Sequence, residues 1–121
     1  MSNNPQPLDD ITVLDFTQIM AGPFCTMLLA DMGADVIKIE KPGGDDIRGI
    51  GPPFINGESA AFLQINRNKR SIVIDLKNTA SYDVISRMIS NADVIVQNFR
   101  PGVMESLNLD YDSVKKINPS I

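Results

Sequence analysis

Histidine is absent from the 121 residues of this chain. Without histidine, the chain cannot assemble a Ser-His-Asp triad, a Cys-His pair or a histidine metal cluster. Any catalysis by these residues alone would have to depend on carboxylates or lysine. Asp45 and Asp46 have no partners at metal-ligand spacing, so no metal site is assigned.

Cysteine and long apolar runs are also scarce. Cys25 is the single cysteine and lies in an apolar segment. No internal disulfide can form, and we expect the thiol to pack as a small hydrophobe in a reducing, cytoplasmic setting. No stretch reaches the roughly 20 apolar residues of a membrane span, so no membrane association is expected. The net charge of −4, from 11 basic and 15 acidic side chains, argues against nucleic-acid binding.

Residues 11–40 predict a strand–helix–strand unit. The first strand covers residues 11–16, and Pro23 lies near the first position of the helix, where its missing N–H costs nothing. Apolar residues recur at helical spacing as far as Met32, and Gly33 follows as a C-cap. A second strand then covers residues 35–40. Two parallel strands joined by a crossover helix are implied.

The alternation continues along the chain. We expect a long loop over residues 41–58, a short helix capped by Ser59 and a basic, solvated segment at residues 67–70. Strands are predicted at residues 71–76 and 93–97. Helices are predicted at residues 80–91, after Pro101, and from a cap at Asp110 or Asp112 to about Ile117. The fold class is therefore α/β. A parallel-sheet, Rossmann-like domain covers residues 11–121, truncated at the start of a fifth strand, after an N-terminal extension of residues 1–10.

The predicted strand ends are rich in cations. Ligands of parallel sheets lie beyond the carboxyl ends of the strands. In this chain those ends carry residues 17–20, then Lys41, then Lys77, then residues 98–100, which include Arg100. Three cations at one edge, together with a helix N-terminus, suit phosphate or pyrophosphate.

Two classes of protein remain open at this point. Glu40 ends the second strand, where a nicotinamide-dependent dehydrogenase places its ribose-binding acid. The first turn nevertheless has a single glycine and lacks the G-x-G-x-x-G pattern. The second class is a non-catalytic nucleotide-binding module.

Three segments carry a specific resemblance. Residues 13–48 (VLDFTQIMAGPFCTMLLADMGADVIKIEKPGGDDIR), residues 66–77 (NRNKRSIVIDLK) and residues 92–121 (ADVIVQNFRPGVMESLNLDYDSVKKINPSI) together resemble the amino-terminal part of the family III CoA-transferases, the CaiB/BaiF family. The resemblance covers nearly the whole chain. It implies that this α/β domain binds CoA.

The resemblance also implies which residues contact CoA. In the family, the turn after the first strand lies beside the acyl thioester end, and the basic residue after the second strand approaches the phosphates. The end of the third strand borders adenine and phosphate, and the segment after the fourth strand lines the same pocket. The matching residues in this chain are Ile19, Met20, Ala21, Lys41, Ile74, Asp75, Leu76, Lys77, Asn98, Phe99 and Arg100.

The implied activity is acyl-CoA:carboxylate CoA transfer, with acyl-CoA and a carboxylic acid acceptor as partners. The catalytic aspartate of the family is expected beyond Ile121, so no catalytic residue is assigned and the isolated chain is expected to be inactive. The alternative within the family is the α-methylacyl-CoA racemase branch. An interlinked homodimer is implied for the full-length protein.

Overall fold

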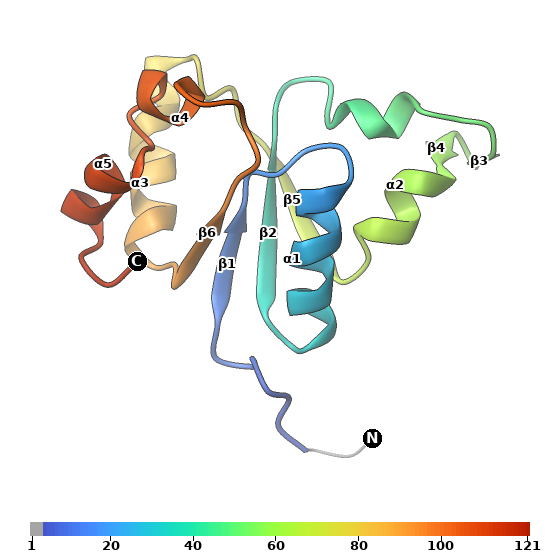
Figure 1. Cartoon of the computed structure of the whole chain (residues 1–121), viewed down its shortest axis with the longest axis horizontal. Helices are drawn as coiled ribbons and strands as arrows, with labels where there is room; N and C mark the ends of the chain where they lie inside the picture. The colour runs from blue at the N-terminus through green and yellow to red at the C-terminus, as the bar shows by residue number, and fades with distance from the viewer. Residues whose placement is uncertain (1–3) are drawn as a thin grey trace.

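A four-stranded parallel sheet forms the centre of the computed structural model, which describes residues 4–121 (Figure 1). The strands are β1 (Thr12–Asp15), β2 (Asp35–Glu40), β5 (Lys69–Val73) and β6 (Val94–Val96), in the order β5-β2-β1-β6. In register, β1 Val13 faces Val36 of β2 on one side and Val94 of β6 on the other. The predicted α/β class with a parallel sheet is confirmed.

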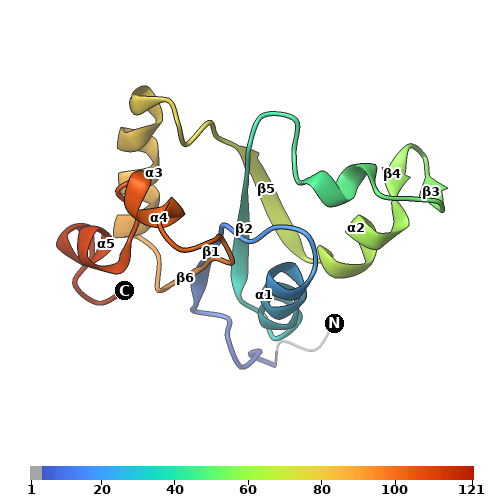
Figure 2. The same cartoon turned by 45° about the horizontal axis from the view of Figure 1, so that its top comes forward.

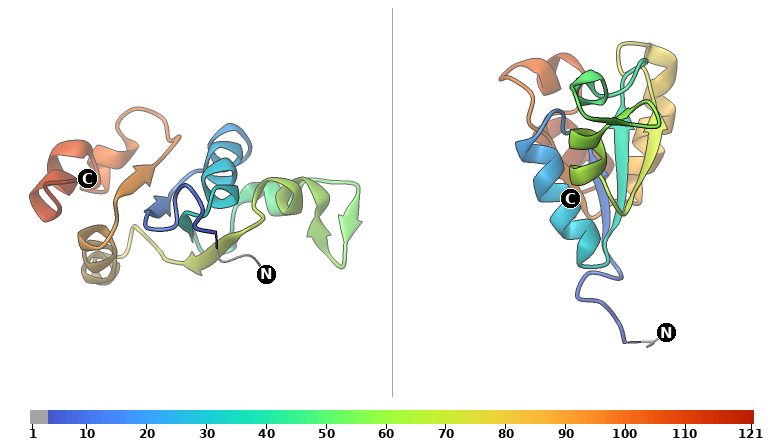
Figure 3. Two further views of the ribbon diagram at one scale, coloured as in Figure 1. Left: turned by 90° about the horizontal axis from the view of Figure 1, so that it is seen from below. Right: turned by 90° about the vertical axis from the view of Figure 1, so that its right-hand side faces the viewer.

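Helices cover both faces of the sheet because the strands alternate their apolar side chains. Val13 and Val36 point to α1 (Ala21–Asp31), where they pack with Ala30 and Ala34. Leu14 and Ile39 belong to the larger cluster on the other face, which is covered by α3 (Tyr82–Ser90), α4 (Val103–Ser106) and α5 (Tyr111–Ile117). Figure 3 shows α1 and α3 on opposite sides of the strands.

A small unit extends from the sheet beyond α1 (Figure 2). It contains a 3-10 helix (Asp46–Gly49), the hairpin β3 (Phe54–Ile55) and β4 (Glu58–Ser59), and α2 (Ala60–Ile65). Sequence analysis predicted only a loop at residues 41–58. The hairpin was missed although Asn56-Gly57, both at positive φ of 52° and 86°, is a typical two-residue hairpin turn. Ser59 caps α2 as predicted, because its side chain accepts from the Phe62 N–H.

Several elements differ from the expected boundaries, and β1 and β6 are each one residue shorter at both ends. β5 begins at Lys69 and ends at Val73, because its ladder with β2 stops where Val73 faces Glu40. A 3-10 helix (Thr79–Ser81) precedes α3, and α4 begins at Val103, because Gly102 takes the left-handed conformation before it. The predicted start of a further strand after Ile117 was wrong. Residues 118–121 form a turn, held by the Asn118 amide, which donates to the Ile89 and Ala92 carbonyls at 2.9 and 2.8 Å.

Two side-chain expectations were also wrong. Cys25 is exposed rather than packed as a small hydrophobe, because it lies on the outer side of α1 beside Phe24 and Leu28, which are 50% and 41% exposed. Lys69 is not solvated, since its side chain is 2% exposed and pairs with Asp15. Among residues 4–121, no helix is long and apolar enough to cross a membrane.

Glu40, at the end of β2, holds the small unit against the sheet. Arg48 donates to its two carboxylate oxygens at 2.8 and 2.6 Å, and the Ser71 hydroxyl and the Asp45 N–H also donate to it. Burial raises the pKa of Glu40, but the hydrogen bonds from Arg48 and Ser71 outweigh burial and lower the pKa from 4.5 to about 2. Both oxygens of the Glu40 carboxylate are therefore occupied by hydrogen bonds within the fold.

This lowered pKa predicts a pH-dependent contribution to stability. A depressed carboxyl pKa stabilises the fold above pH 4.5, and this contribution is lost as the pH falls towards 2. Glu40→Gln should lower the free energy of unfolding by roughly 2–3 kcal/mol at neutral pH. The deficit should shrink between pH 4.5 and 2, measured by urea denaturation. Glu105→Gln on exposed α4 is the control, and a deficit that stays constant over this range would contradict the assignment.

Candidate functional site

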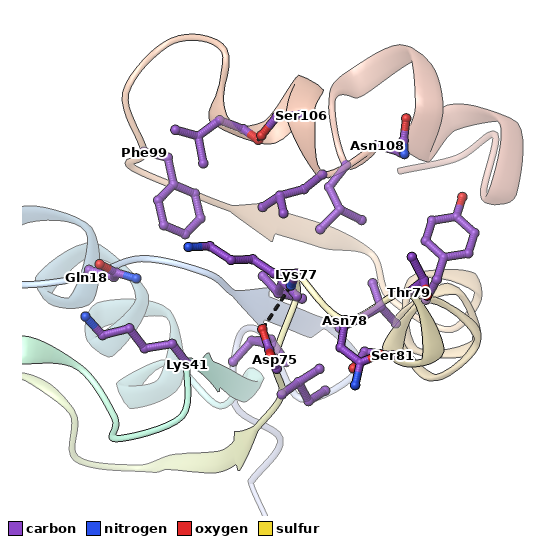
Figure 4. Close-up of a pocket in the computed structure, with 18 residues that line it drawn as sticks. Gln18, Lys41, Asp75, Lys77, Asn78, Thr79, Ser81, Phe99, Ser106 and Asn108 are labelled. Atoms are coloured by element: carbon purple, nitrogen blue, oxygen red, sulfur yellow. Dashed lines mark hydrogen bonds between the residues drawn. The ribbon is translucent and has the colours of Figure 1, made fainter.

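A cavity of about 880 Å³ opens beyond the carboxyl ends of β2 and β5, between the sheet and the α3–α4 layer (Figure 4). Its volume is within the range of small-molecule sites. Residues from the ends of β1 and β2, the segment after β5, α3 and the α4 region line it: Gln18, Ile39, Lys41, Ile74, Asp75, Leu76, Lys77, Asn78, Thr79, Ser81, Tyr82, Ile85, Phe99, Val103, Ser106, Leu107, Asn108 and Leu109.

The floor of the cavity is apolar and continuous with the core. Ile74 and Ile85 line it, yet they are only 7% and 1% exposed and belong to the main hydrophobic cluster. These two side chains support the sheet beneath the cavity, and the partly buried Leu76 and Phe99 add apolar surface that a ligand can contact. Such a surface suits an aromatic or aliphatic group rather than a charged one.

Two lysines supply positive charge to the cavity. Lys41 pairs with Asp46 at 2.7 Å, but both side chains are about half exposed or more, at 47% and 62%, so this surface pair is weak and can exchange for an anion. Lys77 makes no ion pair with any residue from 4 to 121. Its backbone N–H donates to the Asp75 carboxylate at 3.0 Å, which fixes the turn that carries it.

Six of the eleven residues predicted from the sequence line this one cavity: Lys41, Ile74, Asp75, Leu76, Lys77 and Phe99. Met20 and Ala21 line a separate shallow hollow beside Phe24 and Gln64. Ile19, Asn98 and Arg100 line neither hollow. The structure thus brings six of the eight predicted nucleotide-side residues together, without Asn98 and Arg100, and leaves the predicted acyl-side residues outside this cavity.

Several lining residues were missed by sequence reasoning. Asn78 caps the 3-10 helix that follows Lys77, because its side chain accepts from the Ala80 N–H. An Asn two residues before Ala at a strand-to-helix junction is a detectable capping signal. Tyr82 and Asn108 come from distant segments, and no local pattern identifies them.

Two buried ion pairs underlie the loop between β1 and α1. Lys38 pairs with Asp45 at 2.9 Å, and both side chains are 1% exposed. Lys69 pairs with Asp15 at 3.0 Å. Burial lowers the pKa of Lys69, and the Asp15 carboxylate acts in the opposite direction. Asp15 also accepts from Thr26, at 2.6 Å, and from Thr17, so it is a hydrogen-bonded anchor of the loop.

Ile19, in this loop, has a φ of 67°. That left-handed conformation costs a β-branched residue about 1–3 kcal/mol, and it persists only where the surroundings over-determine it. The Asp45 carboxylate accepts from the Ile19 N–H at 3.1 and 3.2 Å, and the Asn98 side chain bonds the Gln18 backbone on both sides.

The model of one protein family, CoA-transferase family III, matches residues 8–121. The chain belongs to this family. The resemblance inferred from the sequence is therefore confirmed.

Family III relatives with assigned activities include the succinyl-CoA:glutarate CoA-transferase of Mus musculus. It is 45% identical over 117 residues, which cover 96% of this chain and 27% of that protein. The formyl-CoA:oxalate CoA-transferase of Afipia carboxidovorans is 44% identical over 115 residues, 94% of this chain and 27% of that protein. This chain therefore spans about a quarter of the length of these relatives.

Solved structures agree with this family membership. A CaiB/BaiF family protein from Brucella suis superposes with a TM-score of 0.90 at 43% identity, covering 95% of this chain and 32% of that chain. A hypothetical protein from Mycobacterium tuberculosis superposes at 0.89 with 44% identity, covering 98% and 33% of the two chains.

The strained Ile19 gives a testable stability difference. Asn tolerates the left-handed conformation far better than Ile, so Ile19→Asn should relieve strain as it removes apolar surface. Ile50 is the matched control because it is similarly exposed, 52% against 40%, and has an ordinary φ of −88°. We expect Ile19→Asn to be less destabilising than Ile50→Asn by about 1 kcal/mol in urea denaturation. Equal or greater destabilisation at Ile19 would show that the loop is not strained.

Proposed function

We propose that this chain forms the amino-terminal CoA-binding part of an acyl-CoA:carboxylate CoA-transferase. The observation that carries the proposal is the cavity at the carboxyl ends of β2 and β5, which combines an apolar floor with two lysines. CoA needs this combination, because its adenine is flat and largely apolar and its phosphates are anionic. Relatives named as succinyl-CoA:glutarate, succinyl-CoA:mesaconate and formyl-CoA:oxalate CoA-transferases support the same activity.

The adenine and phosphates are assigned to the cavity. Ile74 and Leu76 would contact the base, and Lys41 and Lys77 would contact the phosphates as point charges. Phe99 adds apolar surface from the opposite wall, as Figure 4 shows. Arg100 follows Phe99 and would contribute longer-range positive charge.

The acyl end of the substrate is assigned to the loop between β1 and α1. Gln18 lines the cavity, and Met20 and Ala21 line the shallow hollow beyond it. A pantetheine arm that left the cavity past Gln18 would therefore reach residues 19–21. Asn98 would act by holding this loop, because its side-chain amide is already bonded to the Gln18 backbone.

The chain's own residues would bind and orient the thioester rather than react with it. Family resemblance assigns the nucleophile to an aspartate outside this chain, which would attack the thioester and split one difficult transfer into two easier steps. The partners would be an acyl-CoA donor and a carboxylic acid acceptor, and the full-length protein would be an interlinked homodimer. Relatives named for succinyl, glutarate, mesaconate, formyl and oxalate substrates make small carboxylates the acceptor class to test first.

Other functions have less support. Glu40 cannot serve as the ribose-binding acid of a dehydrogenase without breaking its pair with Arg48, at 2.6 Å. The racemase branch is not favoured, since the relatives are named as transferases.

Calorimetric titration with CoA, and with NAD for comparison, tests the proposal. CoA should bind and NAD should not. Lys41→Ala or Lys77→Ala should each weaken CoA binding by roughly 1–3 kcal/mol, the range for hydrogen bonds to charged groups.

Lys116→Ala on α5 is the matched control, because Lys116 is an exposed lysine outside the cavity. It should leave CoA affinity unchanged. If all three variants bound CoA as tightly as the parent at low salt, the assignment of the cavity would be wrong.

A further inference from the structure

Residues 18–20 are held more tightly than a surface loop requires. The Asn98 side chain accepts from the Gln18 N–H and donates to the Gln18 carbonyl, both at 2.9 Å. The next N–H, that of Ile19, donates to the Asp45 carboxylate. Two consecutive residues are thus bonded by side chains from segments 80 and 26 residues away along the chain.

The second of these contacts depends on a buried charge. Asp45 is paired with Lys38 at 2.9 Å, and the Lys38 ammonium also donates to the Thr17 carbonyl at 2.9 Å. A buried ion pair is often no better for stability than apolar residues of the same volume. Stability alone therefore does not explain the pair. Both of its members bond the loop backbone, Lys38 at the Thr17 carbonyl and Asp45 at the Ile19 N–H.

The start of α1 is packed against the same loop. A Cβ added at Gly22 would lie 2.4 Å from the Thr17 Cβ and 3.1 Å from the Asn98 side chain, so only glycine fits. Ile19, in turn, is kept at a φ of 67°, which is unfavourable for its side chain. The buried pair, the Asn98 bonds and the close approach at Gly22 therefore maintain one conformation of residues 18–20 against the strain at Ile19.

We propose that Asp45 and Asn98 are positioning residues for the transfer step. They hold residues 18–20 so that the Gln18 side chain is presented to the cavity and the Met20–Ala21 turn to the reacting end of the acyl-CoA. This inference rests on the proposed function. It assigns Asn98 to the loop rather than to a direct contact with CoA, and it assigns to Asp45 a role beyond capping the 3-10 helix.

The first test compares turnover with CoA affinity in the full-length enzyme. Asn98 is exposed, so Asn98→Ala should fold. A panel of acyl-CoA donors and small carboxylate acceptors gives kcat and KM, and titration with free CoA gives the affinity. We expect CoA affinity within about twofold of the parent and a kcat lowered about 10- to 100-fold, the cost of misplacing reacting groups. Asn91→Ala is the control, because its side chain bonds only the Arg87 carbonyl of α3.

A second pair of variants separates the hydrogen bond from the buried charge. Lys38→Met with Asp45→Asn removes both charges but keeps an acceptor for the Ile19 N–H. Lys38→Met with Asp45→Ala removes both charges and the acceptor. The first double variant should retain most of the kcat, and the second should lose about 10-fold or more relative to it.

The outcomes are distinct. Full kcat in Asn98→Ala, or weakened CoA binding with kcat intact, would overturn the inference, as would equal kcat in the two double variants. If the double variants fail to fold, the kcat and CoA affinity of Asn98→Ala are sufficient to test the inference. A parent enzyme that neither binds CoA nor transfers it would overturn the proposed function, whereas an active parent with unaffected variants would overturn only the positioning role.

Discussion

The buried pair between Lys38 and Asp45 connects the parts of the structure on which the proposed site depends. Lys38 is in β2, Asp45 caps the following 3-10 helix, and both contact the loop after β1. Each charge would be costly to leave unpaired in the interior, so separating β2 from the 3-10 helix would carry a large cost in free energy. Lys41, which lines the cavity, lies between Lys38 and Asp45 in the sequence, so the pair also holds the segment that carries Lys41.

The cavity itself follows from the parallel sheet. Parallel strands end at a common edge, and β5 stops pairing where β2 ends, at Glu40 opposite Val73. The chain then continues as Ile74 to Lys77 across the opening between the sheet and α3. Ile74 stays in the core, while Lys77, in the turn that follows, faces the cavity. Core packing and ligand contact are thus provided by one short stretch.

Much of this arrangement could be predicted from the sequence, because periodicity and capping are local. The predicted bounds of β2 agree with the structure, Ser59 was identified as a cap from residue type alone, and Asp110 is the one of two candidate caps, Asp110 and Asp112, that the structure uses. The parallel-sheet rule predicted that Lys41, Lys77 and Phe99 lie at one edge, and the family resemblance added Ile74 to the same site. The wrong predictions concern long-range partners. Lys69 was read as solvated because nothing local indicates that Asp15, 54 residues earlier, is its partner. The left-handed conformation of Ile19 and the Asn98 contact with Gln18 likewise depend on contacts between distant segments.

A structure of the protein crystallised with CoA tests the central claim most directly. The adenine should lie against Ile74 and Leu76. The phosphates should lie within about 4 Å of the Lys41 and Lys77 ammonium groups, the distance at which an ion pair is effective. The hydrogen bonds between the Asn98 side chain and the Gln18 backbone should be unchanged. The assignment of the cavity would be wrong if CoA bound elsewhere on the fold and side chains of the protein filled this cavity.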